Sequence, residues 1–398
     1  MPYLKPETLA LTILLALITA VGPLATDMYL PVLPTIRQAL GATTAQTQAT
    51  LSGFLVGYAL AQLFYGPVSD RHGRKPAMLF GLALFALGSL FCALAPSIEM
   101  LIIARVAQAL GGAGSVVLAR AMVRDSYAGA RAGRELARIG TIMALVPAVA
   151  PILGAVIAGM FGWRSVFYFM AALGPVMMLV VHRRLPETLV APLTTRFSPL
   201  QMFRDFGGIL KSADFRYYAL LGSLSFAGFF CFLSAGSFVL QGHFGLTERM
   251  FAAAFVVPVI GYMAGATIAQ RKVMSWGIDR MLRAGILICA PSVLLMLVGV
   301  SLGIGGPFAV LVPMGLYQIG FGMILSQSNA GALMPFGDRA GSASSLFSVT
   351  QMGISAIAGV LVGAMVDKTH LALPLGMTAC AGLMLAVLLF APRSAKAD

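Results

Sequence analysis

Ala25-Thr26-Asp27-Met28-Tyr29-Leu30-Pro31 places an acidic residue inside the first long apolar run of the chain. This run begins near Leu9 and continues past Leu30, with no charged residue between positions 9 and 26. A charged side chain at the centre of a bilayer costs at least about 2.5–3.5 kcal/mol. It therefore needs a partner, a bound proton or a water-filled cavity. The stretch predicts a membrane-spanning helix that carries a functional acid.

The composition excludes a soluble fold. Hydrophobic residues make up 59% of the 398 residues and charged residues only 10%, whereas soluble domains carry about 25% charged residues. A spanning helix needs about 20 apolar residues. Twelve such runs can be counted, at about 9–32, 46–68, 75–95, 99–122, 137–160, 164–183, 215–240, 250–270, 281–301, 306–329, 340–364 and 371–391. Because they are long and continuous, they indicate helices and not the short alternating strands of a membrane barrel.

One long polar connection follows the sixth run, from about His182 to Asp214, and it contains several prolines and basic residues. It divides the chain into two halves of six spans. The predicted architecture is an all-α integral membrane protein with pseudo-symmetric halves at 1–185 and 214–398. Between them, residues 186–213 are expected to form a cytoplasmic linker with a short surface helix.

The basic residues predict the orientation of the spans. If both termini are cytoplasmic, 22 of the 27 Lys and Arg residues fall on the cytoplasmic side and four on the other side, with Arg105 inside a span. Cytoplasmic loops of membrane proteins are enriched in Lys and Arg. The net charge of +13 is therefore interpreted as a topology signal and not as a nucleic-acid-binding surface.

The loop between the second and third runs reads Gly66-Pro67-Val68-Ser69-Asp70-Arg71-His72-Gly73-Arg74-Lys75-Pro76. Gly73 permits a left-handed turn, and Asp70 can cap the next helix or pair with an arginine. The loop resembles the signature of the major facilitator superfamily, with Val68 in place of the usual Leu. The resemblance implies a conformational latch formed by Gly66, Asp70, Arg71, Gly73, Arg74 and Lys75. The alternative is that the loop is only a short basic turn on the cytoplasmic side.

The fourth run carries a second charged residue within a span. Arg105 and Gln108 lie three residues apart and so share one helical face, in a segment that resembles the R-x-x-q-G pattern of the same superfamily. An arginine inside a span faces a cavity or a partner. Asp27 is the natural partner, since it is the one acid clearly within an apolar run. The two could form a permanent salt bridge, or a pair that opens and closes with protonation.

The fifth run contains Pro151 and Gly154. It resembles the antiporter signature g-x-x-x-G-P-x-x-G-G, with Ala150 and Ala155 in place of glycines. Proline removes a backbone donor and bends a helix. The alternative is an ordinary proline kink without a role in exchange.

The most specific resemblance involves the opening stretch at 25–31, Ser225-Phe226-Ala227-Gly228 and Leu233-Ser234-Ala235-Gly236 in the seventh run, and Ala340-Gly341-Ser342-Ala343-Ser344-Ser345 at the start of the eleventh. These segments are similar to the bicyclomycin-resistance (Bcr/CflA) branch of the drug:proton antiporters. The resemblance covers nearly the whole chain. It implies the major facilitator fold and export of bicyclomycin, sulfonamides or chloramphenicol-like drugs from a bacterial inner membrane.

Further polar residues within spans are candidates for a substrate cavity. Polar groups in hydrocarbon need cavity water or cross-helix partners, so each could instead join helices together. The predicted substrate-binding residues are Tyr29, Tyr58, Gln62, Gln108, Ser234, Tyr317 and Gln318.

No cofactor or metal is expected. The four cysteines lie in apolar runs without a C-x-x-C pair, and the four histidines lack metal-ligand spacing. No nucleotide-binding loop of the Gly-x-x-x-x-Gly-Lys-Ser/Thr type occurs, which leaves facilitated diffusion or coupling to an ion gradient. The buried carboxylate favours coupling to protons.

The sequence predicts a monomeric, proton-coupled drug exporter that is not an enzyme and acts on small molecules and protons in the bilayer. Asp27 would carry the proton and Arg105 would tune it. The alternatives are an exporter of a specific metabolite such as an amino acid, an importer, and a non-transporting membrane sensor.

Overall fold

The computed structural model describes residues 8–127, 130–143, 145–189 and 199–390, and their secondary structure is helical throughout. Contacts divide the chain into two compact units. One contains Met1–Ala42 and Gly53–Phe197, and the other contains Thr43–Ser52 and Ser198–Asp398. The prediction of an all-α fold is confirmed.

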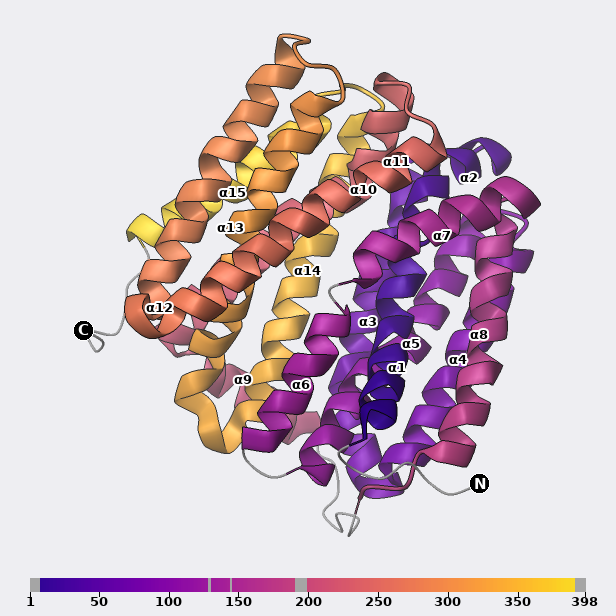
Figure 1. Cartoon of the computed structure of the whole chain (residues 1–398), viewed down its shortest axis with the longest axis vertical. Helices are drawn as coiled ribbons and strands as arrows, with labels where there is room; N and C mark the ends of the chain where they lie inside the picture. The colour runs from indigo at the N-terminus through magenta and orange to yellow at the C-terminus, as the bar shows by residue number, and fades with distance from the viewer. Residues whose placement is uncertain (1–7, 128–129, 144, 190–198, 391–398) are drawn as a thin grey trace. The chain divides into compact units, whose positions relative to one another are not determined.

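The first unit contains the helices drawn from indigo to magenta in Figure 1. Their bounds are α1 Leu9–Asp27, η1 Leu30–Val32, α2 Leu33–Ala39, α3 Thr44–His72, α4 Arg74–Leu94, α5 Ile98–Ser126, α6 Ala130–Met143, α7 Val146–Phe161 and α8 Arg164–Arg184. Helix α5 packs against α4 and α1, and α4 also packs against α8. The first nine residues of α3, 44–52, belong to the second unit.

The second unit contains the helices drawn from rose to yellow (Figure 1). Their bounds are α9 Pro199–Leu210, α10 Ala213–Ser237, η2 Phe238–His243, α11 Glu248–Ala254, α12 Val256–Ser301, α13 Phe308–Leu333, η3 Met334–Arg339, α14 Ala340–Val366 and α15 Ala372–Phe390. Helix α10 packs against α13, α14 and α15, and α12 packs along α13. Short helix α9 lies in the predicted linker, whose residues 190–198 fall outside the described part of the chain, as do both chain ends.

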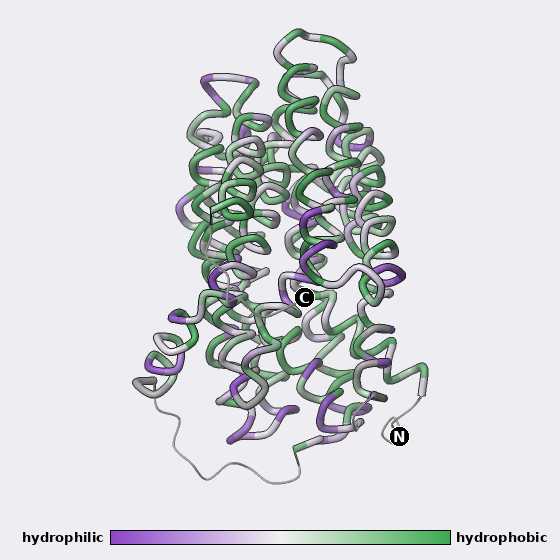
Figure 2. Tube along the Cα trace, turned by 90° about the vertical axis from the view of Figure 1, so that its left-hand side faces the viewer, coloured by the Kyte–Doolittle hydropathy of each residue, from purple (hydrophilic) through white to green (hydrophobic). Residues whose placement is uncertain are grey.

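Eleven helical segments of the described residues are long and apolar enough to cross a membrane. One of them, Glu248–Ser301, has 54 residues and would extend about 81 Å if straight, more than twice the roughly 30 Å hydrocarbon core. It turns back at Gly277, whose φ of 75° is non-helical. The eleven segments therefore contain twelve membrane passes, as predicted. Hydrophobic residues occur along most of the length of the helices (Figure 2).

Two connections differ from the predicted runs. The run predicted at 137–160 consists of two helices, α6 and α7, and Pro147 lies in the first turn of α7, where a missing backbone N–H costs nothing. The polar stretch predicted as a loop between the eighth and ninth runs is helical on both sides of Gly277. Because one glycine with positive φ suffices to reverse the chain, no longer loop is needed.

The two units repeat one local pattern at a constant separation of 204 residues. Thr8 and Ser212 cap α1 and α10, and Gly73 and Gly277 form positive-φ turns. The separation is the same in both pairs (8 to 212 and 73 to 277). This repetition is the structural form of the predicted pseudo-symmetry of the two halves.

Candidate transport site

Arg105 lies at the centre of the first unit and is fully buried. Its Nη1 donates to the carbonyl oxygen of Ala25 in α1 (2.9 Å) and to Oε1 of Gln108 (2.6 Å). Aromatic rings cover the guanidinium, since its carbon lies 4.3 Å from the centroid of Phe54 and 4.7 Å from that of Tyr29. Such contacts stabilise a cation that has lost its water. Nε and Nη2 have no hydrogen-bond partner in the described structure.

Asp27 is the last residue of α1 and is also buried, with 7% of its surface exposed. The Thr26 hydroxyl donates to its Oδ1 at 3.3 Å, and this is the one side-chain hydrogen bond of its carboxylate within the described residues. No ion pair joins Asp27 to Arg105 there. A permanent salt bridge, one of the two predicted forms of the pair, is therefore not seen, because Arg105 reaches the α1 backbone two residues earlier and directs the same Nη1 to Gln108. A pair that opens and closes with protonation stays a prediction.

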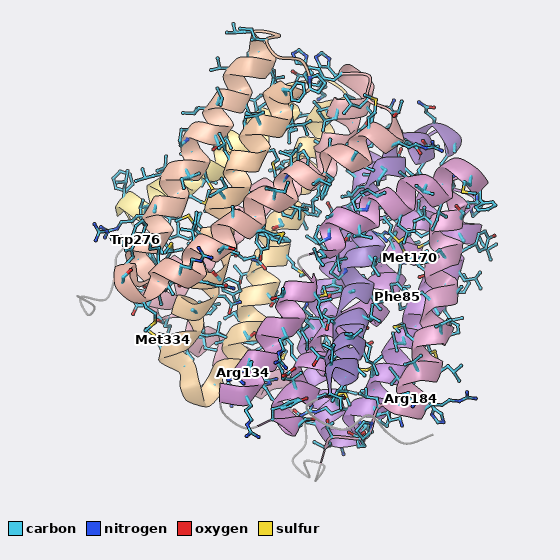
Figure 3. The ribbon with its side chains drawn as sticks, viewed as in Figure 1. Phe85, Arg134, Met170, Arg184, Trp276 and Met334 are labelled. Atoms are coloured by element: carbon cyan, nitrogen blue, oxygen red, sulfur yellow. The ribbon has the colours of Figure 1, made fainter. Side chains whose placement is uncertain are left out.

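Gln108 links Arg105 to helices α4 and α8. Its Nε2 donates to Oγ of Ser89 (2.8 Å) and approaches Sδ of Met170 (3.5 Å), and Ser89 in turn donates to the carbonyl of Phe85 (2.7 Å). Figure 3 labels Phe85 and Met170. Gln108 therefore holds Nη1 of Arg105 in place while its own amide group and the Ser89 hydroxyl are hydrogen-bonded.

The predicted antiporter segment packs against the residue that follows the acid. Helix α7 packs on η1 and α1, and its Gly154 is so close to Met28 that an added Cβ would overlap the Met28 carbonyl oxygen. Pro151 is buried in the same helix. The close approach therefore requires glycine at 154 and places α7 beside the residue that follows Asp27.

The two predicted tyrosines of the first unit occupy different surroundings. Tyr29 is fully buried against Phe167 and the Arg105 guanidinium. Tyr58 in α3 is hydrogen-bonded to Gln62 one turn later, and its hydroxyl lies against Gly22 of α1. Gln62 is partly exposed. Thus α1 is contacted by polar side chains of α3 and α5 over its last two turns.

The second unit places Tyr317 between helices. This residue of α13 is fully buried, and its hydroxyl donates to the carbonyl of Ser225 in α10 at 2.7 Å. A Cβ at Gly228 would overlap that hydroxyl. Cys289 in α12 donates to the Tyr317 carbonyl at 3.4 Å. These contacts tie α10, α12 and α13 together at Tyr317.

Ser234 and Gln318 are buried in the same unit, at 0% and 3% exposure. The Ser234 carbonyl accepts from Nε2 of Gln48 at 2.9 Å, and Thr44, one turn earlier, donates from its amide and hydroxyl to Asp367 after α14. Oε1 of Gln318 and Oγ of Ser234 have no partner among the described atoms. Six of the seven predicted substrate-binding residues are thus buried in this structure, and Gln62 is the exception.

The predicted latch residues gather around Arg74, which is 8% exposed. Its side chain pairs with Asp70 (2.5 Å) and Asp125 (2.8 Å) and donates to Oγ of Ser69 (2.7 Å). Glu187 accepts the backbone amides of Arg74 and Lys75, both at 3.0 Å. The network joins the ends of α3, α5 and α8. Arg71 is exposed, and Gly66 contributes its carbonyl to Ser69.

Three acids of the site, Asp125, Glu187 and Glu135, are not predicted from the sequence. Glu135 in α6 is buried, accepts from Thr12 of α1 (2.8 Å) and pairs with Arg138 (2.6 Å). The sequence does contain a signal for them, because these acids lie in segments that are rich in arginine and lysine. An acid among such arginines is a candidate partner for one of them.

Comparisons with known proteins agree with this architecture. The model of the Major Facilitator Superfamily matches residues 15–360. The chain is 35% identical over 381 residues to "Uncharacterized MFS-type transporter YdgK" of Bacillus subtilis (93% of this chain, 92% of that one). It is 30% identical to "Bicyclomycin resistance protein homolog" of Haemophilus influenzae (94% of each chain) and 31% identical to "Chloramphenicol resistance protein" of Pseudomonas aeruginosa (89% and 82%).

Among solved structures, a D-xylose-proton symporter superposes with a TM-score of 0.75 at 13% identity, over 97% of this chain and 99% of that one. This likeness concerns the fold. The family match and the relatives extend it to the sequence itself. The chain is therefore a membrane transporter and not an enzyme, and it belongs to the Major Facilitator Superfamily.

Proposed function

We propose that this transporter exports small drugs from the bacterial cytoplasm in exchange for protons. The observation that carries the proposal is the buried carboxylate of Asp27, which lies in the core of the first unit without a cationic partner among the described residues. The names of two relatives that match most of the chain, a bicyclomycin resistance protein homolog and a chloramphenicol resistance protein, support drugs as the substrate class.

Asp27 is assigned as the residue that takes up and releases the coupled proton. A carboxylate changes its charge and its hydrogen-bonding capacity with protonation, and in a buried site this change cannot be absorbed by bulk water. Since Asp27 ends α1, a change in its contacts acts on the α1 terminus. Arg105 holds the same segment through the Ala25 carbonyl and is assigned as the residue that tunes it.

Helix α7 is assigned as the element that moves when Asp27 gains or loses its proton. Its Gly154 touches the Met28 carbonyl, so a shift of the α1 terminus displaces α7 directly. Rigid close packing transmits such shifts because it leaves no free volume to absorb them. Gln62 and Tyr58 are proposed to contact substrate on α3, and the network around Arg74 is proposed to act as the conformational latch.

The transporter is placed in the inner membrane with both termini in the cytoplasm and acts as a monomer. The strongly uneven distribution of basic residues supports this orientation.

The test is chloramphenicol accumulation in a strain that lacks its main efflux pumps. Expression of the wild-type chain should lower accumulation, an uncoupler should restore it, and Asp27→Asn should behave like the uncoupler. If drug accumulation is unchanged while an amino acid leaves the cells faster, the chain is a metabolite exporter and the proposal fails.

A further inference from the structure

The two positive-φ turns at Gly73 and Gly277 occupy equivalent places in their units but differ in how their charges are neutralised. At the first turn, Asp70 and Asp125 pair with Arg74, and Glu187 accepts the amides of Arg74 and Lys75. The ammonium group of Lys75 donates to the His182 carbonyl. Acceptors from the protein itself therefore surround this turn.

The second turn carries the same sign of charge without those acids. We call residues 271–283 the basic turn. Its four cationic side chains, Arg271, Lys272, Arg280 and Arg283, are exposed, and none forms an ion pair with a carboxylate in the described part of the chain. Its one acid, Asp279, accepts from the Tyr218 hydroxyl at 3.0 Å. The position that corresponds to Asp70 of the first turn, 204 residues later, is Met274.

Large apolar side chains stand among these cations. Met274 is 93% exposed and Trp276 is 39% exposed. The Arg280 guanidinium lies 5.9 Å from the Trp276 ring. In Figure 3, Trp276 lies at the outer edge of the turn in α12. Tryptophan is enriched at the membrane–water interface, so this turn presents an aromatic side chain suited to that interface together with exposed cations.

We propose that the basic turn binds the headgroup of an anionic phospholipid, such as phosphatidylglycerol. The lipid phosphate pairs with the exposed cations of the basic turn, and the acyl chains cover Met274 and Trp276. Clusters of Lys and Arg beside a spanning helix attract anionic lipid, each contributing roughly fivefold to the affinity. A soluble anion would satisfy the arginines but would leave the two apolar side chains in water.

The chain offers a direct optical test because Trp163 and Trp276 are its two tryptophans. Trp163→Phe leaves Trp276 as the single fluorophore. In nanodiscs of phosphatidylcholine, an equal fraction of acyl-brominated phosphatidylglycerol or acyl-brominated phosphatidylcholine is added. We expect phosphatidylglycerol to quench Trp276 at a severalfold lower mole fraction. Equal quenching by the two lipids would overturn the proposal.

A matched pair of variants separates lipid binding from the general topology signal. Arg280→Gln with Arg283→Gln removes two charges from the basic turn and should raise the phosphatidylglycerol fraction for half-maximal quenching by roughly fivefold for each charge. Arg183→Gln with Arg184→Gln removes two charges from the end of α8 and should leave it unchanged. An equal effect of both pairs would mean that the turn has no binding site of its own.

A measurement in detergent distinguishes a lipid from a free anion. Dioctanoyl phosphatidylglycerol should raise the melting temperature of the purified protein, and the Arg280/Arg283 variant should lose that shift. Dioctanoyl phosphatidylcholine and inorganic phosphate at equal ionic strength should have no effect. Stabilisation by inorganic phosphate alone to the same extent would contradict the assignment to a lipid. None of these measurements depends on transport activity.

Discussion

Gly154 of α7 and the carbonyl oxygen of Met28 lie in direct contact, with no room for a methyl group between them. This relationship places the predicted antiporter segment against the residue that follows Asp27. It gives the segment a physical role beyond bending a helix, because α7 and the end of α1 cannot move independently.

Gly154→Ala should reduce export strongly and lower thermal stability, since a Cβ would overlap a backbone oxygen and overpacking typically costs about 1–3 kcal/mol. Gly140→Ala in α6 is the control, because no atom lies within 4 Å of a Cβ added there. It should leave export and melting temperature unchanged. Drug-accumulation assays and melting curves of the purified variants check this, and normal export by Gly154→Ala would show that the contact has no role in transport.

Asp125→Asn should leave the protein inserted but reduce export, as should Asp70→Asn, because each removes a charge that faces the buried Arg74. A hydrogen bond to a charged group contributes about 1.5–3 kcal/mol, so the melting temperature should fall in both. Asp205→Asn is the comparison, since it removes an ion pair in which the arginine, Arg339, is exposed and lies 3.8 Å away, and exposed ion pairs contribute little. Wild-type export by both Asp70→Asn and Asp125→Asn would mean that the loop is only a turn.

Tyr317 and Gly228 should behave as a coupled pair. Gly228→Ala alone should be destabilising, because its methyl group would overlap the Tyr317 hydroxyl. In a Tyr317→Phe background the hydroxyl is absent, so the same alanine should cost less. Melting temperatures of the two single variants and the double variant measure this coupling. We expect Tyr317→Phe to keep export, and a specific loss of drug binding in that variant would instead support the predicted substrate contact.

The topology can be tested by cysteine labelling, after replacement of the four buried native cysteines. Cysteines at positions 131 and 196 should be protected from an impermeant maleimide in intact cells, whereas cysteines at positions 37 and 248 should react. The reason is the excess of basic residues on one side of the spans. Reaction of position 196 from outside would reverse the orientation.

Much of the fold could be predicted from the sequence because each membrane-spanning helix corresponds to a long apolar run in the sequence. The turn at Gly277 was less predictable. Arg271 and Lys272 suggested a loop, but charged residues also occur in helices at the membrane surface. Only the backbone angles distinguish a loop from a helix there. Similarly, the break between α6 and α7 falls within one apolar run, where hydropathy carries no information.

The sequence predicted which residues belong to the site better than it predicted the contacts between them. Asp27 and Arg105 stand out in sequence because both are charged and lie within spans. Their separation depends on the register of α1 against α5 and on the arginine rotamer, neither of which the sequence specifies. The same limit applies to Tyr317, whose polar group suggested a cavity but whose hydroxyl reaches a backbone carbonyl.

Uphill transport by Asp27→Asn in proteoliposomes energised only by a pH gradient tests most directly whether Asp27 carries the coupled proton. Asparagine keeps the size of the side chain but cannot carry a proton. The wild-type protein should accumulate the neutral drug chloramphenicol against its gradient. The variant should still bind the drug and move it down a gradient, but it should neither concentrate it nor release protons when the drug binds. If Asp27→Asn accumulates chloramphenicol as the wild type does, the coupling proton is carried by another residue.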